Sequence, residues 1–184
     1  QKYSGRALSE DLPLDPVNPY GLQKKHGEEM IKMWAKSLWP DGMDTVSLRF
    51  FNVFGPRQKR DSAYATAIER FLHQWRANQP ITIVPDGTQR RDMVFVKDVV
   101  GAIRLAAESK NNFSGEVINI GSGKNYSILE IADIIGGDKY SRTFIEPRSG
   151  EVRESLADIS KAKQLLGWEP NVSFEEGIVA LKAE

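Results

Sequence analysis

Short apolar segments alternate with helical segments along most of this chain, and this alternation constrains the fold more than any other feature. Strand-like apolar segments occupy residues 45–51, 81–84, 93–96, 116–120 and 143–145. Helical patterns mark residues 20–38, 63–77 and 98–108. Strands that alternate with helices form a mainly parallel sheet with helices packed on it. The sequence therefore predicts an α/β fold, with residues 45–51 as a buried strand.

Polar residues mark where several helices begin. Ser127 and Glu130 have the spacing of a capping box, in which each side chain bonds the backbone amide of the other residue. Ser173 and Glu176 repeat that spacing before the last helix. Asp98 is positioned to start the helix that runs to residue 108.

Other turn residues predict where segments end. We expect Asp158 to cap a helix that Gly167 terminates. Residues 52–62 are expected to form a loop. Gly121 and Gly123 give only a G-x-G, which indicates a turn between a strand and a helix rather than a dinucleotide-binding loop.

Charge and composition exclude several functional classes. The 184 residues include 25 basic and 25 acidic side chains, and this balance argues against a nucleic-acid or membrane partner. There are no cysteines, and neither His26 nor His73 has neighbours in a metal-ligand pattern, so no metal site is predicted. No apolar run reaches the length of a membrane span and no signal peptide is visible. A cytoplasmic setting is expected.

Tyr20 and Lys24 are four residues apart in a segment expected to be helical, so they share one helix face. A phenol titrates near pH ~10, and an ammonium group held close to it favours the phenolate. Such a pair can exchange a proton with a substrate hydroxyl. The spacing alone is weak evidence, because tyrosine and lysine fall four apart on many helices without any catalytic role.

Several strings, in order, resemble one family over nearly the whole chain. They are PYGLQKKHGEE, RFFNVFGPRQ, DGTQRRDMVFVKDV, INIGSGKNYSILEI and EPRSGEVRESLADISKAKQLLGWEP. The chain is thereby identified as similar to the extended short-chain dehydrogenase/reductase superfamily, to which the nucleotide-sugar epimerases and dehydratases belong. It most resembles the UDP-glucose and UDP-N-acetylglucosamine 4-epimerases.

The resemblance implies an NAD-dependent reaction. Tyr20 would be the catalytic acid/base. Lys24 would favour its phenolate form and hydrogen-bond the nicotinamide ribose, and Val53 would lie close to the nicotinamide. The implied partner is a nucleotide sugar.

The resemblance also implies a set of substrate contacts. Asn52 would contact the substrate near its diphosphate, Arg91 and Arg148 would bind the phosphates, and Glu151 would hold the ribose hydroxyls. Ser155 stands where some epimerases have a bulky residue, so its small side chain would admit an N-acetyl group. Other interpretations stay open: Arg91 as an ion pair with the neighbouring aspartate, Arg148 and Glu151 as a solvated loop pair, and Asn52 as a turn residue.

The implied fold is the C-terminal part of an NAD(P)-binding Rossmann-like epimerase. Residues 1–60 and 92–120 would be remnants of the sheet and its helices, and residues 61–91 and 121–184 mainly the substrate-binding lobe. The N-terminal dinucleotide half is expected to be missing, which would leave this fragment inactive. Two alternatives are a non-catalytic nucleotide-sugar-binding module and a dimerisation fragment that associates through Met30, Met33, Trp34 and Leu38. Because the other strands of the parallel sheet are expected to be missing, we expect exposed apolar faces and open strand edges to cause self-association.

Overall fold

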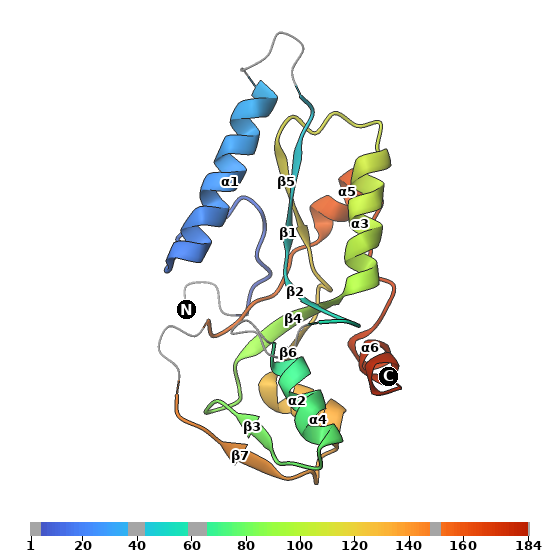
Figure 1. Cartoon of the computed structure of the whole chain (residues 1–184). Coiled ribbons are helices and arrows are strands. Elements are labelled where there is room, and N and C mark those ends of the chain that lie inside the picture. Colours follow the sequence, from blue (N-terminus) through green and yellow to red (C-terminus); the bar gives the residue numbers. More distant parts are fainter. Residues whose placement is uncertain (1–4, 37–42, 59–65, 148–151, 184) are drawn as a thin grey trace.

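The computed structural model describes residues 5–36, 43–58, 66–147 and 152–183, and it confirms the α/β fold (Figure 1). The elements run in the order α1 (Pro19–Lys36), β1 (Val46–Phe50), β2 (Asn52–Phe54), α2 (Ala67–Arg76), β3 (Ile81–Ile83), β4 (Arg90–Phe95), α3 (Val96–Glu108), β5 (Glu116–Ile120), β6 (Asn125–Ser127), α4 (Ile128–Gly136), β7 (Arg142–Phe144), α5 (Ser160–Leu166) and α6 (Phe174–Lys182).

The upper region consists of α1, β1, β5, α3 and α5 (Figure 1). β1 and β5 pair in parallel, from Val46 opposite Glu116 to Phe50 opposite Ile120. α1 lies on one face of this pair, and α3 and α5 lie on the other (Figure 1). Between that second face and the helices is the upper cluster, whose buried members are Val94, Val99, Ala102, Phe113, Ile118, Ile120, Ala162, Leu166 and Trp168.

A three-stranded sheet, β2–β4–β6, joins the upper region to the rest of the chain. One residue, Phe51, separates β1 from β2, and its backbone N–H donates to the Ile120 carbonyl at 2.9 Å. The prediction of a loop from residue 52 is wrong for Asn52–Phe54, because these residues pair in parallel with Met93–Phe95. Only that long-range partner makes so short a segment a strand.

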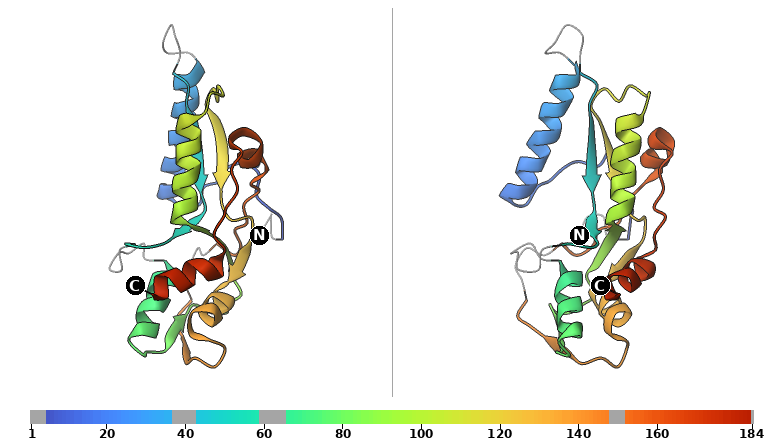
Figure 2. Two further views of the ribbon diagram at one scale, coloured as in Figure 1. Left: turned by 90° about the vertical axis from the view of Figure 1, so that its right-hand side faces the viewer. Right: turned by 45° about the vertical axis from the view of Figure 1, so that its right-hand side comes forward.

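The lower region consists of β2, β4, β6, β3, β7, α2, α4 and α6, and it packs around one core. β3 and β7 pair in parallel. In both views of Figure 2, α2, α4 and α6 lie at the same end of the molecule as these two strands. The lower cluster comprises Phe54, Ile68, Phe71, Leu72, Ile81, Ile83, Met93, Phe95, Ile128, Ile131, Ala132, Ile135, Phe174, Ile178 and Leu181. The range 121–184 as a substrate lobe stays a prediction, and α5 within it packs against β5.

Both predicted capping boxes are confirmed. Ser127 Oγ accepts from the Glu130 amide at 3.1 Å, while Glu130 Oε2 accepts from the Ser127 amide at 2.6 Å. Ser173 and Glu176 make the same two bonds at the start of α6. These contacts satisfy amides that have no partner within the helix.

Two other predicted helix caps need correction. Asp98 lies inside the first turn of α3, and its carboxylate accepts from the amides of Asn171 and Val172, both at 3.1 Å. It therefore joins α3 to the segment before α6 instead of capping its own helix. Ile159 occupies the cap position of α5, although Asp158 does accept from the Ser160 amide at 2.9 Å.

The predicted roles of three glycines, Gly121, Gly123 and Gly167, are confirmed in part. Gly167 ends α5 in a left-handed conformation, with φ of 61°. Gly121 and Gly123 do form a turn, but it joins strand β5 to strand β6 rather than a strand to a helix.

The upper region leaves apolar side chains open to solvent. Met30, Met33 and Trp34 of α1 are 59%, 58% and 43% exposed, and Leu38 lies outside the described residues. The prediction that 45–51 is a buried strand is wrong in part: within β1 only Ser47 is buried and Phe50 is 46% exposed. β1 has one partner strand, β5, among the described residues. Within the same part of the chain, no helix is long and apolar enough to cross a membrane.

Candidate functional site

The start of α1 carries the candidate acid/base pair. Asn18 Oδ1 accepts from the Gly21 amide at 2.8 Å, which caps α1 two residues before Tyr20. The Tyr20 side chain is exposed, and Lys24 Nζ lies 5.4 Å from the centre of its ring. This distance allows a cation–π attraction. The one-turn spacing predicted from the sequence is thus present, and the phenol is open to a ligand.

Asn52 and Ser155 come together beside Asp92 of β4, although they are far apart in sequence. Asn52 Nδ2 donates to the Asp92 carbonyl at 2.9 Å and to Ser155 Oγ at 3.3 Å. Ser155 Oγ also accepts from the Asp92 amide at 3.3 Å. The side chain of Asn52 therefore ties strand β2 to β4 and to the segment that contains Ser155.

The other predicted site residues are distributed around this group. Arg91 is half-buried in β4, and its Nη1 donates to the Arg90 carbonyl at 2.9 Å. Val53 pairs with Val94 and packs against the upper cluster. Arg148 and Glu151 lie outside the described residues.

Asp92 is the residue at the centre of this site that sequence reasoning missed. It is fully buried, and its carboxylate accepts from the Ser122 amide at 2.7 Å, the Ser122 hydroxyl at 2.8 Å, the Gly123 amide at 3.1 Å and the Ala157 amide at 2.9 Å. Burial raises the pKa of Asp92, and these hydrogen bonds act against that rise. The available signal was its position, because Asp92 directly precedes the apolar run 93–96.

Comparison with known proteins decides the family. The model of the NAD dependent epimerase/dehydratase family matches residues 3–121. The chain belongs to this family.

The similarity to individual family members extends over nearly all of this epimerase/dehydratase chain. YtcB of Bacillus subtilis, an uncharacterized UDP-glucose epimerase, is 38% identical over 174 residues, which are 93% of this chain and 52% of that protein. The UDP-glucose 4-epimerase of Thermotoga maritima, solved with UDP-glucose, is 35% identical with a TM-score of 0.87. The UDP-glucuronic acid 4-epimerase of Bacillus cereus, solved with UDP-glucuronic acid and NAD, is 38% identical with a TM-score of 0.85.

The lengths differ between this family member and its relatives. The two structures are matched over 96% of this chain, but over 56% of the Thermotoga maritima chain and 55% of the Bacillus cereus chain. The chain thus spans about half the length of the relatives it matches.

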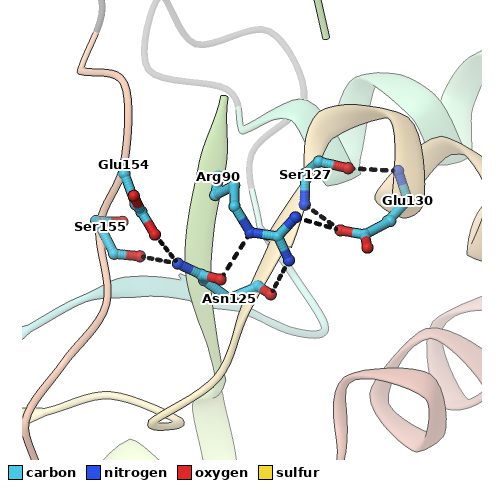
Figure 3. A network of polar contacts seen from close by, with 6 residues as sticks. All are labelled: Arg90, Asn125, Ser127, Glu130, Glu154 and Ser155. Atoms are coloured by element: carbon cyan, nitrogen blue, oxygen red, sulfur yellow. Dashed lines mark hydrogen bonds and ion pairs between the residues drawn. The ribbon is translucent and has the colours of Figure 1, made fainter. Parts of the chain in front are cut away.

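Figure 3 shows a second polar network of this epimerase/dehydratase chain. One of its members, Asn125, lies opposite Asp92 in the β4–β6 pair. Arg90 donates through Nε to Asn125 Oδ1 and through Nη2 to the Asn125 carbonyl, both at 2.8 Å, and it pairs with Glu130 at 3.1 Å. Asn125 Nδ2 donates to Glu154 Oε1 at 3.0 Å and to the Ser155 carbonyl at 3.4 Å. Arg90 and Asn125 thereby link α4 to the segment that carries Ser155.

Proposed function

We propose that this chain provides the acid/base pair and the substrate-binding part of an NAD-dependent nucleotide-sugar 4-epimerase that acts on a UDP-hexose. The observation that carries the proposal is the exposed Tyr20 on the first turn of α1, with Lys24 Nζ 5.4 Å from its ring. Family membership supports it. The ligands of the Thermotoga maritima and Bacillus cereus relatives, UDP-glucose and UDP-glucuronic acid, supply the substrate class.

Lys24 on α1 and Val53 on β2 are the residues that we propose to contact one end of NAD. Lys24 is exposed and can donate to a ribose hydroxyl, and Val53 is apolar and half-buried. When bound, NAD accepts a hydride from the sugar and returns it. Tyr20 would then take up and return the proton of the sugar hydroxyl.

The substrate contacts follow from the chemistry of the side chains. Arg91 presents a planar fork of donors suited to phosphate oxygens, and Arg148 would supply a second one. Asn52 would lie near the diphosphate. Glu151 would accept hydrogen bonds from the two ribose hydroxyls, as a carboxylate can.

Ser155 is the proposed determinant of the sugar substituent. Its side chain is small and half-buried, and it lies against Asn52. We expect this space to admit an N-acetyl group. Ser155→Tyr in a catalytically complete protein should then suppress use of UDP-N-acetylglucosamine relative to UDP-glucose, and an unchanged preference would refute the assignment.

Calorimetric titration tests the proposed function. UDP-glucose should bind the chain, and Arg91→Ala should weaken that binding by about tenfold, as expected for loss of a charged hydrogen-bonding contact. Arg104→Ala is the matched control, because Arg104 is an exposed arginine on α3 that lies 3.7 Å from its i,i+4 partner Glu108. Absence of UDP-glucose binding by the wild-type chain would reject the proposal.

A second experiment separates catalysis from binding alone. The chain is joined to the remaining half of the Thermotoga maritima relative, and conversion of UDP-glucose is measured. Tyr20→Phe should abolish conversion while UDP-glucose still binds. Conversion that survives this substitution would favour a different acid/base. Binding without any conversion in the wild-type hybrid would favour a non-catalytic nucleotide-sugar-binding module.

We also propose that copies of this chain associate with one another. Met30, Met33 and Trp34 project from α1 as an exposed apolar face. Exposed faces of this kind are typical of interaction surfaces. A second copy of the chain is the proposed partner.

A further inference from the structure

We propose that Asp92 is the positioning residue of the substrate site and that it fixes the segment around Ser155 against Asn52. This inference rests on the proposed function, since it assigns a role to Asp92 within that same site. Asp92 would not touch the substrate. It would act by holding the residues that do.

The carboxylate of Asp92 joins two segments that are distant in sequence. One oxygen accepts from the amide and hydroxyl of Ser122, and the other accepts from the amides of Gly123 and Ala157. The first two residues belong to the turn between β5 and β6, and Ala157 follows Ser155 by two positions. The carboxylate thus determines how closely the segment of Ser155 approaches that turn.

The backbone of Asp92 holds the other side of the same site. Its carbonyl accepts from Asn52 Nδ2 at 2.9 Å, and its amide donates to Ser155 Oγ at 3.3 Å. Asp92 therefore contacts both proposed substrate residues through its backbone, while its side chain holds the segment that follows one of them.

Close packing at Gly121 indicates that there is little free space between the β5–β6 turn, Asp92 and Ala157. A Cβ atom at Gly121 would lie 2.5 Å from Ala157 Cβ and 2.9 Å from Asp92 Oδ2. Gly121 thus allows the β5–β6 turn to approach Asp92. In so tight a space, a change in the carboxylate should displace the segment that it holds.

The outer side of the Ser155 segment is held independently. Asn125 donates to Glu154 Oε1 and to the Ser155 carbonyl (Figure 3). The Leu8 amide donates to the Leu156 carbonyl at 2.7 Å, and the Asp158 amide donates to the Leu8 carbonyl at 3.1 Å. Loss of the Asp92 carboxylate should therefore shift the segment without releasing it.

Asp92→Asn is the direct test, because it keeps the size of the side chain. An ionised carboxylate is an acceptor on both oxygens, whereas an amide has one acceptor oxygen and an NH2 group that would face donors. The affinities for UDP-glucose and for UDP are measured in both proteins. We expect the affinity for UDP-glucose to fall about tenfold, with a much smaller change for UDP, because the sugar side of the site is displaced.

Asp98→Asn is the matched control. Asp98 is also buried, and its carboxylate accepts from the amides of Asn171 and Val172, away from Ser155. This variant should lower the melting temperature and leave the ratio of the two affinities unchanged. A purely structural role for Asp92 predicts the same behaviour from both variants.

Two further measurements keep the test decisive. Hydrogen exchange at the amides of Gly123 and Ala157 should be faster in Asp92→Asn than in the wild type. If that variant fails to fold, Ser122→Ala removes one donor to the carboxylate, and it should shift the affinity ratio in the same direction by about threefold.

The outcomes distinguish this inference from the proposed function. If the wild type binds UDP-glucose and the Asp92 and Ser122 variants keep its affinity ratio, the role of Asp92 is wrong and the proposed function stands. If the wild type binds neither ligand, the proposed function is wrong and the role of Asp92 falls with it.

Discussion

The lower region buries most of its described apolar side chains in one core, whereas the upper region exposes more of its apolar surface. Phe54, in the lower cluster, is 1% exposed and contacts Phe95 and Phe174 at ring-centre distances of 5.4 Å and 5.2 Å. Phe50, four residues earlier, is 46% exposed. The lower region therefore buries Phe54, Phe95 and Phe174 in its own core, whereas the upper region leaves apolar side chains exposed.

The way in which helices are attached differs in the same sense. α4 and α6 of the lower region each start with a capping box and pack apolar residues into the lower cluster. Polar contacts join α1 of the upper region to β1 and to Thr45, the residue before β1. Arg49 donates two hydrogen bonds to Glu28, at 2.6 and 2.7 Å, and the Thr45 hydroxyl donates to the Ile31 carbonyl at 3.3 Å. The apolar side chains of Met30, Met33 and Trp34 on α1 remain exposed.

Phe54→Ala should have the largest effect on stability. Removing a fully buried phenylalanine leaves a cavity, and we expect the free energy of unfolding to fall by about 3–5 kcal/mol. Phe50→Ala, the matched change in the upper region, should cost about 1 kcal/mol or less. Urea denaturation measures both values. Equal costs would remove the contrast between the two regions.

Glu28→Gln should have an intermediate effect, because it breaks the polar attachment of α1. Arg49 and Glu28 are largely buried, so the loss of this charged pair should lower the free energy of unfolding by about 1–3 kcal/mol. Glu29→Gln is the control: Glu29 is exposed, its partner Lys25 is 3.9 Å away, and the change should be within about 0.5 kcal/mol. Faster amide exchange confined to α1 in Glu28→Gln would sharpen the comparison, and identical stability of both variants would contradict it.

The double substitution Met30→Lys with Met33→Lys should have the smallest effect on stability. It should clearly lower the molecular mass of the assembly in solution. Both side chains are exposed, so the free energy of unfolding should change by no more than about 0.5 kcal/mol. Light scattering should show an assembly for the wild type and a monomer for the double variant. Val179→Lys, at an exposed apolar position of α6 in the lower region, should leave the assembly intact. A wild-type chain that is monomeric at high concentration would refute self-association.

Local signals in the sequence accounted for most helices and strands and for both capping boxes. Interactions between distant residues accounted for what was missed. Strand β2 exists because Asn52–Phe54 pairs with β4, and no property of three residues predicts that pairing. The four donors to Asp92 come from residues 30 to 65 positions away. The family resemblance therefore suggested Asn52 and Ser155 for the candidate site but not the residue that contacts both.

The single residue between β1 and β2 has a consequence for how a ligand could enter and leave. Two further connections between the regions are short: β4 continues directly into α3, and four residues, 121–124, join β5 to β6. Hinge opening needs residues that can absorb large changes in backbone angles. Phe51 is held by its bond to Ile120, and the turn at 121–124 is held by Asp92. The two regions should therefore keep their relative orientation when a ligand enters or leaves.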